Sequence, residues 1–153
     1  MSELDADVAE VLAEVGVFEP DPQNEVHQKL VAAIRRTRGQ AAGVRLAAMR
    51  WVFAWALEQE GTALAETRAA YDSLKARHVI RFRDAGERSG EMCEKRADAM
   101  DDVKDAHLSF RVAEQRERLA RKRLDAISDQ IKVWQSLNAN ERAADFHHAR
   151  SGT

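Results

Sequence analysis

Apolar and small residues between positions 103 and 138 recur in alternating steps of three and four residues without a slip. A period of 3.5 residues held over five heptads predicts a helix with a left-handed seam against another helix. Alanines at every seventh position of the first half let that second helix approach closely. The eleven seam positions are Val103, Ala106, Phe110, Ala113, Glu117, Ala120, Leu124, Ile127, Ile131, Trp134 and Asn138.

A second stripe with helical spacing runs through the middle of the chain, from about Gln40 onwards. Gly61 and Thr62 leave a kink and a continuous helix equally open. The segment Ala85 to Gly90 contains Gly86, Ser89 and Gly90 between two strongly helical stretches, which predicts a tight connection. The stripe consists of Leu46, Met49, Phe53, Leu57, Leu64, Tyr71 and Leu74, with Glu60, Thr67 and His78 at the remaining spacings.

These patterns predict an all-α protein built on a long antiparallel helical hairpin, or coiled coil, with additional short N-terminal helices. Residues 1–22 form an acidic helix, capped by Ser2 and stopped at Gly16, followed by a linker. Residues 23–60 form basic and aromatic helices, the first capped by Asn24. Residues 61–149 form the hairpin, with its tip near 85–90 and a second arm that is one helix from about Glu91.

Composition fits this picture and limits the class of protein. The chain of 153 residues has only 7 Gly and 2 Pro, as expected for one domain of long helices. The sequence shows neither a signal peptide nor an apolar run long enough to cross a membrane. A lone Cys93 forms no internal disulfide. We therefore expect a cytoplasmic protein without a membrane partner.

Charge is distributed unevenly along the chain. The formal net charge is −2, but the first 25 residues carry eight acids and no Lys or Arg, so the rest stands at +6. From Val26 to Leu57 there is no acid at all. Clustered cations without acids between them favour phosphate contacts, and hence a polyanionic partner such as nucleic acid. The candidate nucleic-acid-binding residues are Lys75, Arg77, Arg81, Arg83, Arg35, Arg36 and Arg45.

The sequence carries no phosphate-binding glycine loop, no nucleophile motif and no paired metal-ligand spacing. We therefore expect no enzyme activity, no cofactor and no bound metal. Trp51 and Trp55 lie four residues apart and share a helical face. They are either a stacking surface for nucleobases or contacts within a core or an oligomer.

The second arm of the hairpin is longer than the segment 62–85 can cover. Its surplus apolar surface must meet the N-terminal helices, a second subunit, or both, and we expect both. The sequence therefore predicts a homo-oligomer. The candidate oligomer-interface residues are Trp134, Ile131, Ile127, Leu124 and Leu137.

The sequence Leu74-Lys75-Ala76-Arg77 before a glycine-containing turn and a long helix resembles the phage recombination mediators of the UvsY type, over about residues 62–148. The segment from Arg123 to Asn138 is also similar to the C-terminal helices of that group. The resemblance implies a homo-oligomer that binds single-stranded DNA and helps a recombinase displace a single-strand binding protein. Where that family has paired tyrosines this chain has His78 and Val79, so only Lys75 and Arg77 inherit a DNA contact.

The leading hypothesis is a non-enzymatic protein that binds single-stranded DNA in the cytoplasm of a bacterial host cell, with a recombinase or a single-strand binding protein as further partners. The alternative is an oligomeric coiled-coil interaction module, such as an adaptor, inhibitor or assembly factor, without nucleic-acid binding. In that alternative the acidic arm, residues 2–25, pairs with the basic block, residues 26–57, of the same or a neighbouring subunit. A helix-turn-helix regulator built on residues 24–57 is a third, disfavoured possibility.

Overall fold

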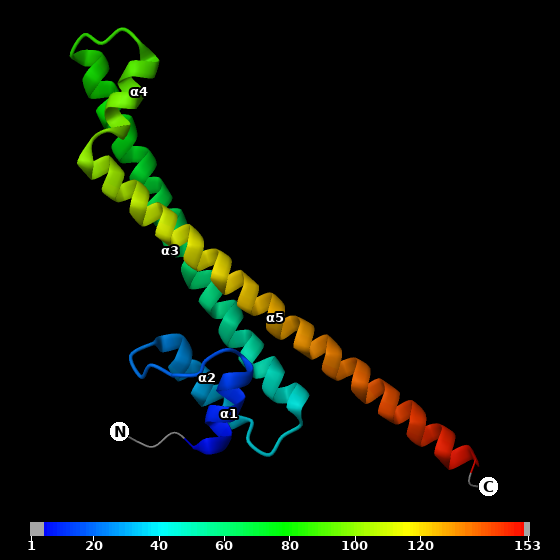
Figure 1. Cartoon of the computed structure of the whole chain (residues 1–153). Helices are drawn as coiled ribbons and strands as arrows, with labels where there is room; N and C mark the ends of the chain where they lie inside the picture. Colours follow the sequence, from blue (N-terminus) through cyan, green and yellow to red (C-terminus); the bar gives the residue numbers. More distant parts are fainter. Residues whose placement is uncertain (1–4, 152–153) are drawn as a thin grey trace. The chain divides into compact units, whose positions relative to one another are not determined.

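The computed structural model describes residues 5–151, and describes side chains for residues 5–145. All the regular elements in this part of the chain are α-helices, so the all-α prediction is confirmed (Figure 1). The helices are α1 (Ala6–Glu14), α2 (Glu25–Arg36), α3 (Ala42–Asp84), α4 (Gly90–Asp98) and α5 (Asp101–Ser151).

The chain divides into two compact units. We call the residues up to 56 together with those from 121 onwards the core unit, and residues 57–120 the hairpin unit. Helices α3 and α5 each contribute to both.

The core unit is assembled around apolar side chains of α1, α2, the beginning of α3 and the second half of α5. Leu12, Leu30 and Met49 are fully buried, and Ile127 is 2% exposed. Helix α1 has nine residues, which is too short to be stable alone in water. Its fold therefore depends on burying its apolar face against this core.

The ends of the first two helices follow their sequence signals. The Asn24 Oδ1 accepts hydrogen bonds from the backbone N–H groups of Val26 at 3.0 Å and His27 at 3.3 Å, which caps α2 as predicted. Gly16, just beyond α1, has a φ of +79°, a conformation that favours glycine. The predicted cap at Ser2 lies outside the described residues.

The hairpin unit pairs the second half of α3 with α4 and the beginning of α5. Tyr71 stacks on Phe110 with ring centroids 6.1 Å apart. Seven residues further along α3, His78 Nε2 lies 2.8 Å from Asp102 Oδ2. Increasing residue numbers on one arm thus meet decreasing numbers on the other, which confirms the antiparallel hairpin. The arms are joined at residues 85–89, where the tip was predicted.

Helix α3 runs through Gly61 and Thr62 without a break. The Thr62 hydroxyl donates to the carbonyl oxygen of Glu58 at 3.1 Å. This bond satisfies the hydroxyl within the helix and leaves the backbone ladder intact. Of the two possibilities left open by the sequence, the continuous helix is the correct one.

The second arm differs from the expectation of one helix starting near Glu91. Helix α4 ends at Asp98, and α5 starts at Asp101 after Ala99 and Met100. Asp101 and Asp102 occupy the first turn of α5, where carboxylates are favoured by the helix dipole. The seam begins only at Val103, so the heptad pattern contained no information about the preceding nine-residue helix.

Candidate nucleic-acid interface

Lys75, which the resemblance assigned to DNA contact, is already engaged inside the hairpin unit. Its Nζ lies 2.8 Å from Asp98 Oδ1 and 3.0 Å from Asp98 Oδ2, and its side chain is only 26% exposed. The hydrogen bond to Asp98 raises the pKa of Lys75, although desolvation opposes the shift. The ammonium group therefore joins α3 to α4.

Three of the predicted residues at the end of α3 have charged groups that are free to bind a phosphate. Arg77, Arg81 and Arg83 are exposed, and none of them forms an ion pair with any residue in the described part of the chain. Arg77 and Arg81 are four positions apart and therefore share a face of α3, and Ile80, three positions after Arg77, lies beside this face at 58% exposure. Arg83 points to the other side, because two residues correspond to about 200° of helix rotation.

A fourth exposed arginine, Arg88, lies in the connection between α3 and α4 and was not predicted as a site residue. The carboxylate of the neighbouring Glu87 does not pair with Arg88 in the described part of the chain. In the structure Glu87 Oε2 instead lies 3.6 Å from Arg96 Nη2, and Glu87 Oε1 accepts the Ser89 N–H at 3.2 Å. The sequence does not show that Glu87 has these other partners, so it does not identify Arg88 as an unpaired cation.

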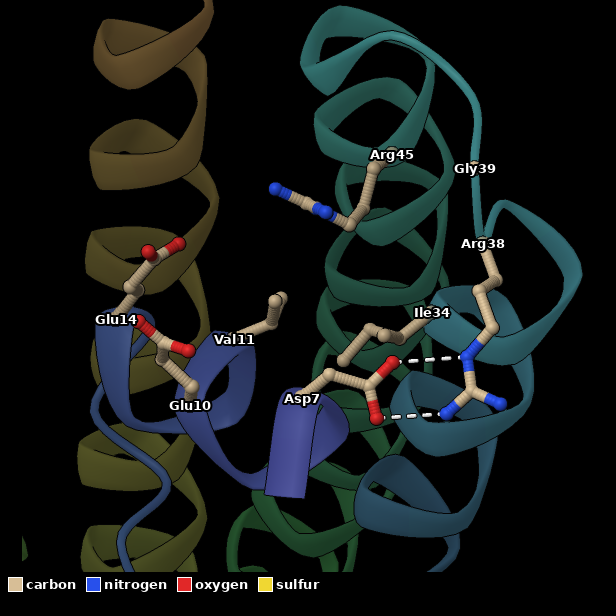
Figure 2. A pocket seen from close by; sticks show the side chains of 8 residues that line it. All are labelled: Asp7, Glu10, Val11, Glu14, Ile34, Arg38, Gly39 and Arg45. Carbon is tan, nitrogen blue, oxygen red and sulfur yellow. Dashed lines mark hydrogen bonds and ion pairs between the residues drawn. The ribbon is translucent and has the colours of Figure 1, made fainter. Parts of the chain in front are cut away.

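In the core unit the acidic helix α1 lies beside the basic block (Figure 2). Arg38 holds Asp7 through two hydrogen bonds, from Nε at 2.8 Å and from Nη2 at 2.6 Å, and Nη2 also reaches Asp5 Oδ2 at 3.0 Å. Arg35 Nε lies 3.8 Å from the same Asp5 oxygen. The intrachain pairing of the acidic arm with the basic block thus occurs at Asp5 and Asp7.

The remaining two predicted cations of this block differ in their surroundings. Arg36 is exposed, and its Nε donates a long hydrogen bond of 3.4 Å to the carbonyl oxygen of Ala32. Arg45 is half-buried and extends into a hollow of about 260 Å³ between α1 and the start of α3, together with Glu10 and Glu14 (Figure 2). Carboxylates on this side would repel a phosphate, so Arg45 is a poorer phosphate ligand than Arg77 or Arg81.

Two paired carboxylates lead to a prediction about acid stability. Hydrogen bonding from Arg38 lowers the pKa of Asp7, and hydrogen bonding from His78 lowers that of Asp102, both below the ordinary value of 3.8. A depressed carboxylate pKa stabilises the fold above the unfolded value, and this contribution is lost as the pH falls below 3.8. We expect the urea concentration at the unfolding midpoint to be lower at pH 2 than at pH 4. This decrease should be smaller in D7N and in D102N than in the intact protein.

The control for that experiment is D105N. Asp105 is an exposed carboxylate whose side chain forms no ion pair within the described residues. The urea midpoint of D105N should therefore depend on pH in the same way as that of the intact protein. Equal pH dependence in D7N, D102N and the intact chain would contradict the assigned role of these two pairs.

The two neighbouring tryptophans have different environments. Trp55 is half-buried, and Lys29 Nζ lies 4.4 Å from the centroid of its ring. Trp51 is 73% exposed. Trp51 is therefore not a core residue of the chain, and a stacking surface and an oligomer contact both stay open for it.

The five predicted oligomer-interface residues are partly used within the chain itself. Ile127 lies in the core, and the half-buried Leu124 packs against it. Ile131 and Trp134 are half-buried. Leu137 is 58% exposed, as is its neighbour Val133 at 59%. Of the five, Leu137 thus has the most surface left for a second subunit, and homo-oligomer formation stays a prediction.

The described residues contain no group of three or more His, Cys, Asp or Glu side chains placed to hold a metal ion. In the same part of the chain, no helix combines the length and the apolar character needed to cross a membrane. Comparison with family models, curated proteins and solved structures finds no match.

Proposed function

We propose that this chain binds single-stranded DNA without catalysing a reaction, and that Arg77 and Arg81 contact the phosphates. The main support is that the cations at the hairpin end of α3 differ in whether they have an ion-pair partner. Lys75 is neutralised by Asp98 at 2.8 Å, whereas Arg77, Arg81 and Arg83 are exposed and unpaired within the described residues. Guanidinium groups without a carboxylate partner are suited to bind phosphate.

Single-stranded DNA is favoured over a duplex because of an apolar side chain beside the two arginines. Ile80 is 58% exposed and offers an apolar surface to unpaired bases, whereas the outside of a duplex presents mainly phosphates and sugars. The resemblance to UvsY-type mediators extends the proposal to a homo-oligomer that helps to load a recombinase in the cytoplasm of a bacterial host cell.

The test is fluorescence anisotropy of a labelled single-stranded oligonucleotide and of a duplex of equal length, across a salt series. Two phosphate contacts, from Arg77 and Arg81, predict a slope of log affinity against log salt of about −1.4 for the single strand. The single strand should bind more tightly than the duplex. An unchanged anisotropy at low salt would remove nucleic acid as the partner.

One observation favours the alternative, an interaction module that binds protein. On the outer face of α5 in the hairpin unit, Leu108, Val112 and Leu119 are 63%, 44% and 50% exposed. Their spacing of four and seven residues places them on one side of the helix. If anisotropy shows no DNA binding, this apolar stripe is the surface on which a protein partner should be sought.

A further inference from the structure

Trp51 presents an unused aromatic surface on α3 in the core unit. Its side chain is 73% exposed, and among the described residues no aromatic ring stacks on it and no cation lies over it. Tryptophan is usually well buried, because its large apolar area is costly to leave in water. A tryptophan at this level of exposure, in a chain with few aromatic residues, suggests a contact that the isolated chain does not provide.

The residues that precede Trp51 on its face of α3 are apolar. Val44, which is 47% exposed, and the exposed Ala47 precede Trp51 by seven and four positions and lie on the same face of the helix. Arg50 precedes Trp51 in the sequence, and its Nε donates to Ser128 Oγ of α5 at 3.2 Å. The first carboxylate that follows on this helix is Glu58.

A second cation lies at the neighbouring tryptophan. Lys29 Nζ is placed over the ring of Trp55, 4.4 Å from its centroid, and Glu25 Oε1 lies 3.3 Å from the same ammonium group. Lys29 thus covers one face of Trp55 but leaves Trp51 open. The two aromatic residues therefore differ in role: Trp55 is covered by its own chain, whereas Trp51 is free to take a ligand.

We propose that Trp51 is a stacking platform for an unpaired nucleobase. This inference rests on the proposed binding of single-stranded DNA and adds a second contact to it. Every base has an aromatic face that an exposed indole can cover, so such a contact tolerates any sequence. A duplex cannot use it, because its bases are already stacked on both faces. Arg36 and Arg50 form no ion pair within the described residues, so this part of the chain retains cations that a polyanionic strand can use.

The test compares W51A with the intact protein on two labelled strands of equal length, one of thymidine nucleotides and one of abasic nucleotides. Both strands carry the same phosphates, but only the first can stack. We expect W51A to lose roughly 5- to 100-fold in affinity for the thymidine strand. Its affinity for the abasic strand and its salt slope should equal those of the intact protein. W51F should recover most of the loss, because phenylalanine also stacks.

The matched control is F18A. Phe18 is an exposed aromatic residue at 79% exposure, but it lies in the acidic linker next to Glu19, so its removal should not affect binding of either strand. Far-ultraviolet circular dichroism checks that each variant is folded, which is expected because both rings are largely outside the core.

The outcomes separate the two proposals. If the intact protein binds neither strand, the proposed function fails and the stacking inference fails with it. If the intact protein binds the thymidine strand and W51A binds it equally well, the stacking inference alone is overturned. If W51A changes the sedimentation coefficient of the protein and leaves DNA affinity unchanged, the Trp51 face is a contact between copies, which also overturns it.

Discussion

Reversing the charge of two arginines, in R77E/R81E, is expected to weaken single-strand binding by roughly 100-fold at low salt. A hydrogen bond to a charged group contributes at least about 1.5 kcal/mol, which corresponds to about tenfold in affinity for each arginine. The slope of log affinity against log salt should become less steep by about 1.4, because each lost phosphate contact removes about 0.7 from the slope for a single strand.

Anisotropy across the same salt series measures both quantities. The control variant is R68E/R142E, which reverses two exposed arginines elsewhere in the chain and so changes the net charge equally. A general electrostatic attraction would be weakened to the same degree by both variants. Equal losses would therefore contradict a localised phosphate site at the end of α3. Because Arg77 and Arg81 are exposed, the double substitution should leave the protein folded, and circular dichroism verifies this.

The second large effect concerns two glycines of α3, at which replacement by alanine should change the free energy of unfolding in opposite directions. A Cβ atom at Gly43 would overlap the ring of Trp134, with its Cε3 carbon at 2.7 Å, whereas a Cβ atom at Gly61 would meet nothing within 4 Å. We expect G43A to destabilise the protein by about 1–2 kcal/mol, because the indole must leave its site over the helix. G61A should stabilise it by about 0.5–1 kcal/mol, since alanine favours a helix over glycine.

Urea unfolding followed by circular dichroism measures both free energies. The two variants carry the same chemical change in the same helix, so G61A serves as the control for helix propensity. G43A should also shift the tryptophan emission to longer wavelength as Trp134 becomes more exposed to water. A G43A protein as stable as G61A would show that the Trp134 ring does not need its place against Gly43.

The helical seams were predictable from the sequence because they depend on local periodicity alone. Each of the eleven seam positions between Val103 and Asn138 is buried or half-buried in the structure. The same holds for the stripe from Leu46 to His78. Any two long helices with complementary stripes bury them against something, so the exposure pattern follows before the partner helix is known. The tip at 85–89 was equally clear from Gly86, Ser89 and the following Gly90.

The state of the cations was not predictable, because ion pairs are formed between residues far apart in the sequence. Lys75 meets Asp98 across the hairpin, 23 positions away, and Arg38 meets Asp5 at a separation of 33. An acid-free run identifies cations without neighbours on their own segment only. The three arginines at the end of α3 have no ion-pair partner within the described residues, as the sequence indicated, whereas Lys75 and Arg35 each have one.

The different exposures of Trp51 and Trp55 also lay beyond the sequence. A spacing of four places the two residues on one face of a helix, but the boundary of the buried stripe passes between them. That boundary depends on where α2 packs against α3, and Lys29 of α2 reaches Trp55 only. Periodicity fixes the direction of a side chain and leaves open how far the neighbouring helix extends over it.

The alanines of the seam carry an evolutionary consequence. Ala113 and Ala120 are 6% and 9% exposed, so the hairpin arms meet there over side chains of one carbon. A lineage that acquires valine or leucine at either position must accept a smaller residue on the facing α3 surface, because a close-packed interface has no spare volume. Among descendants of this sequence, substitutions at 113 and 120 should therefore be inherited in compensating pairs with α3, while the exposed positions between them drift independently.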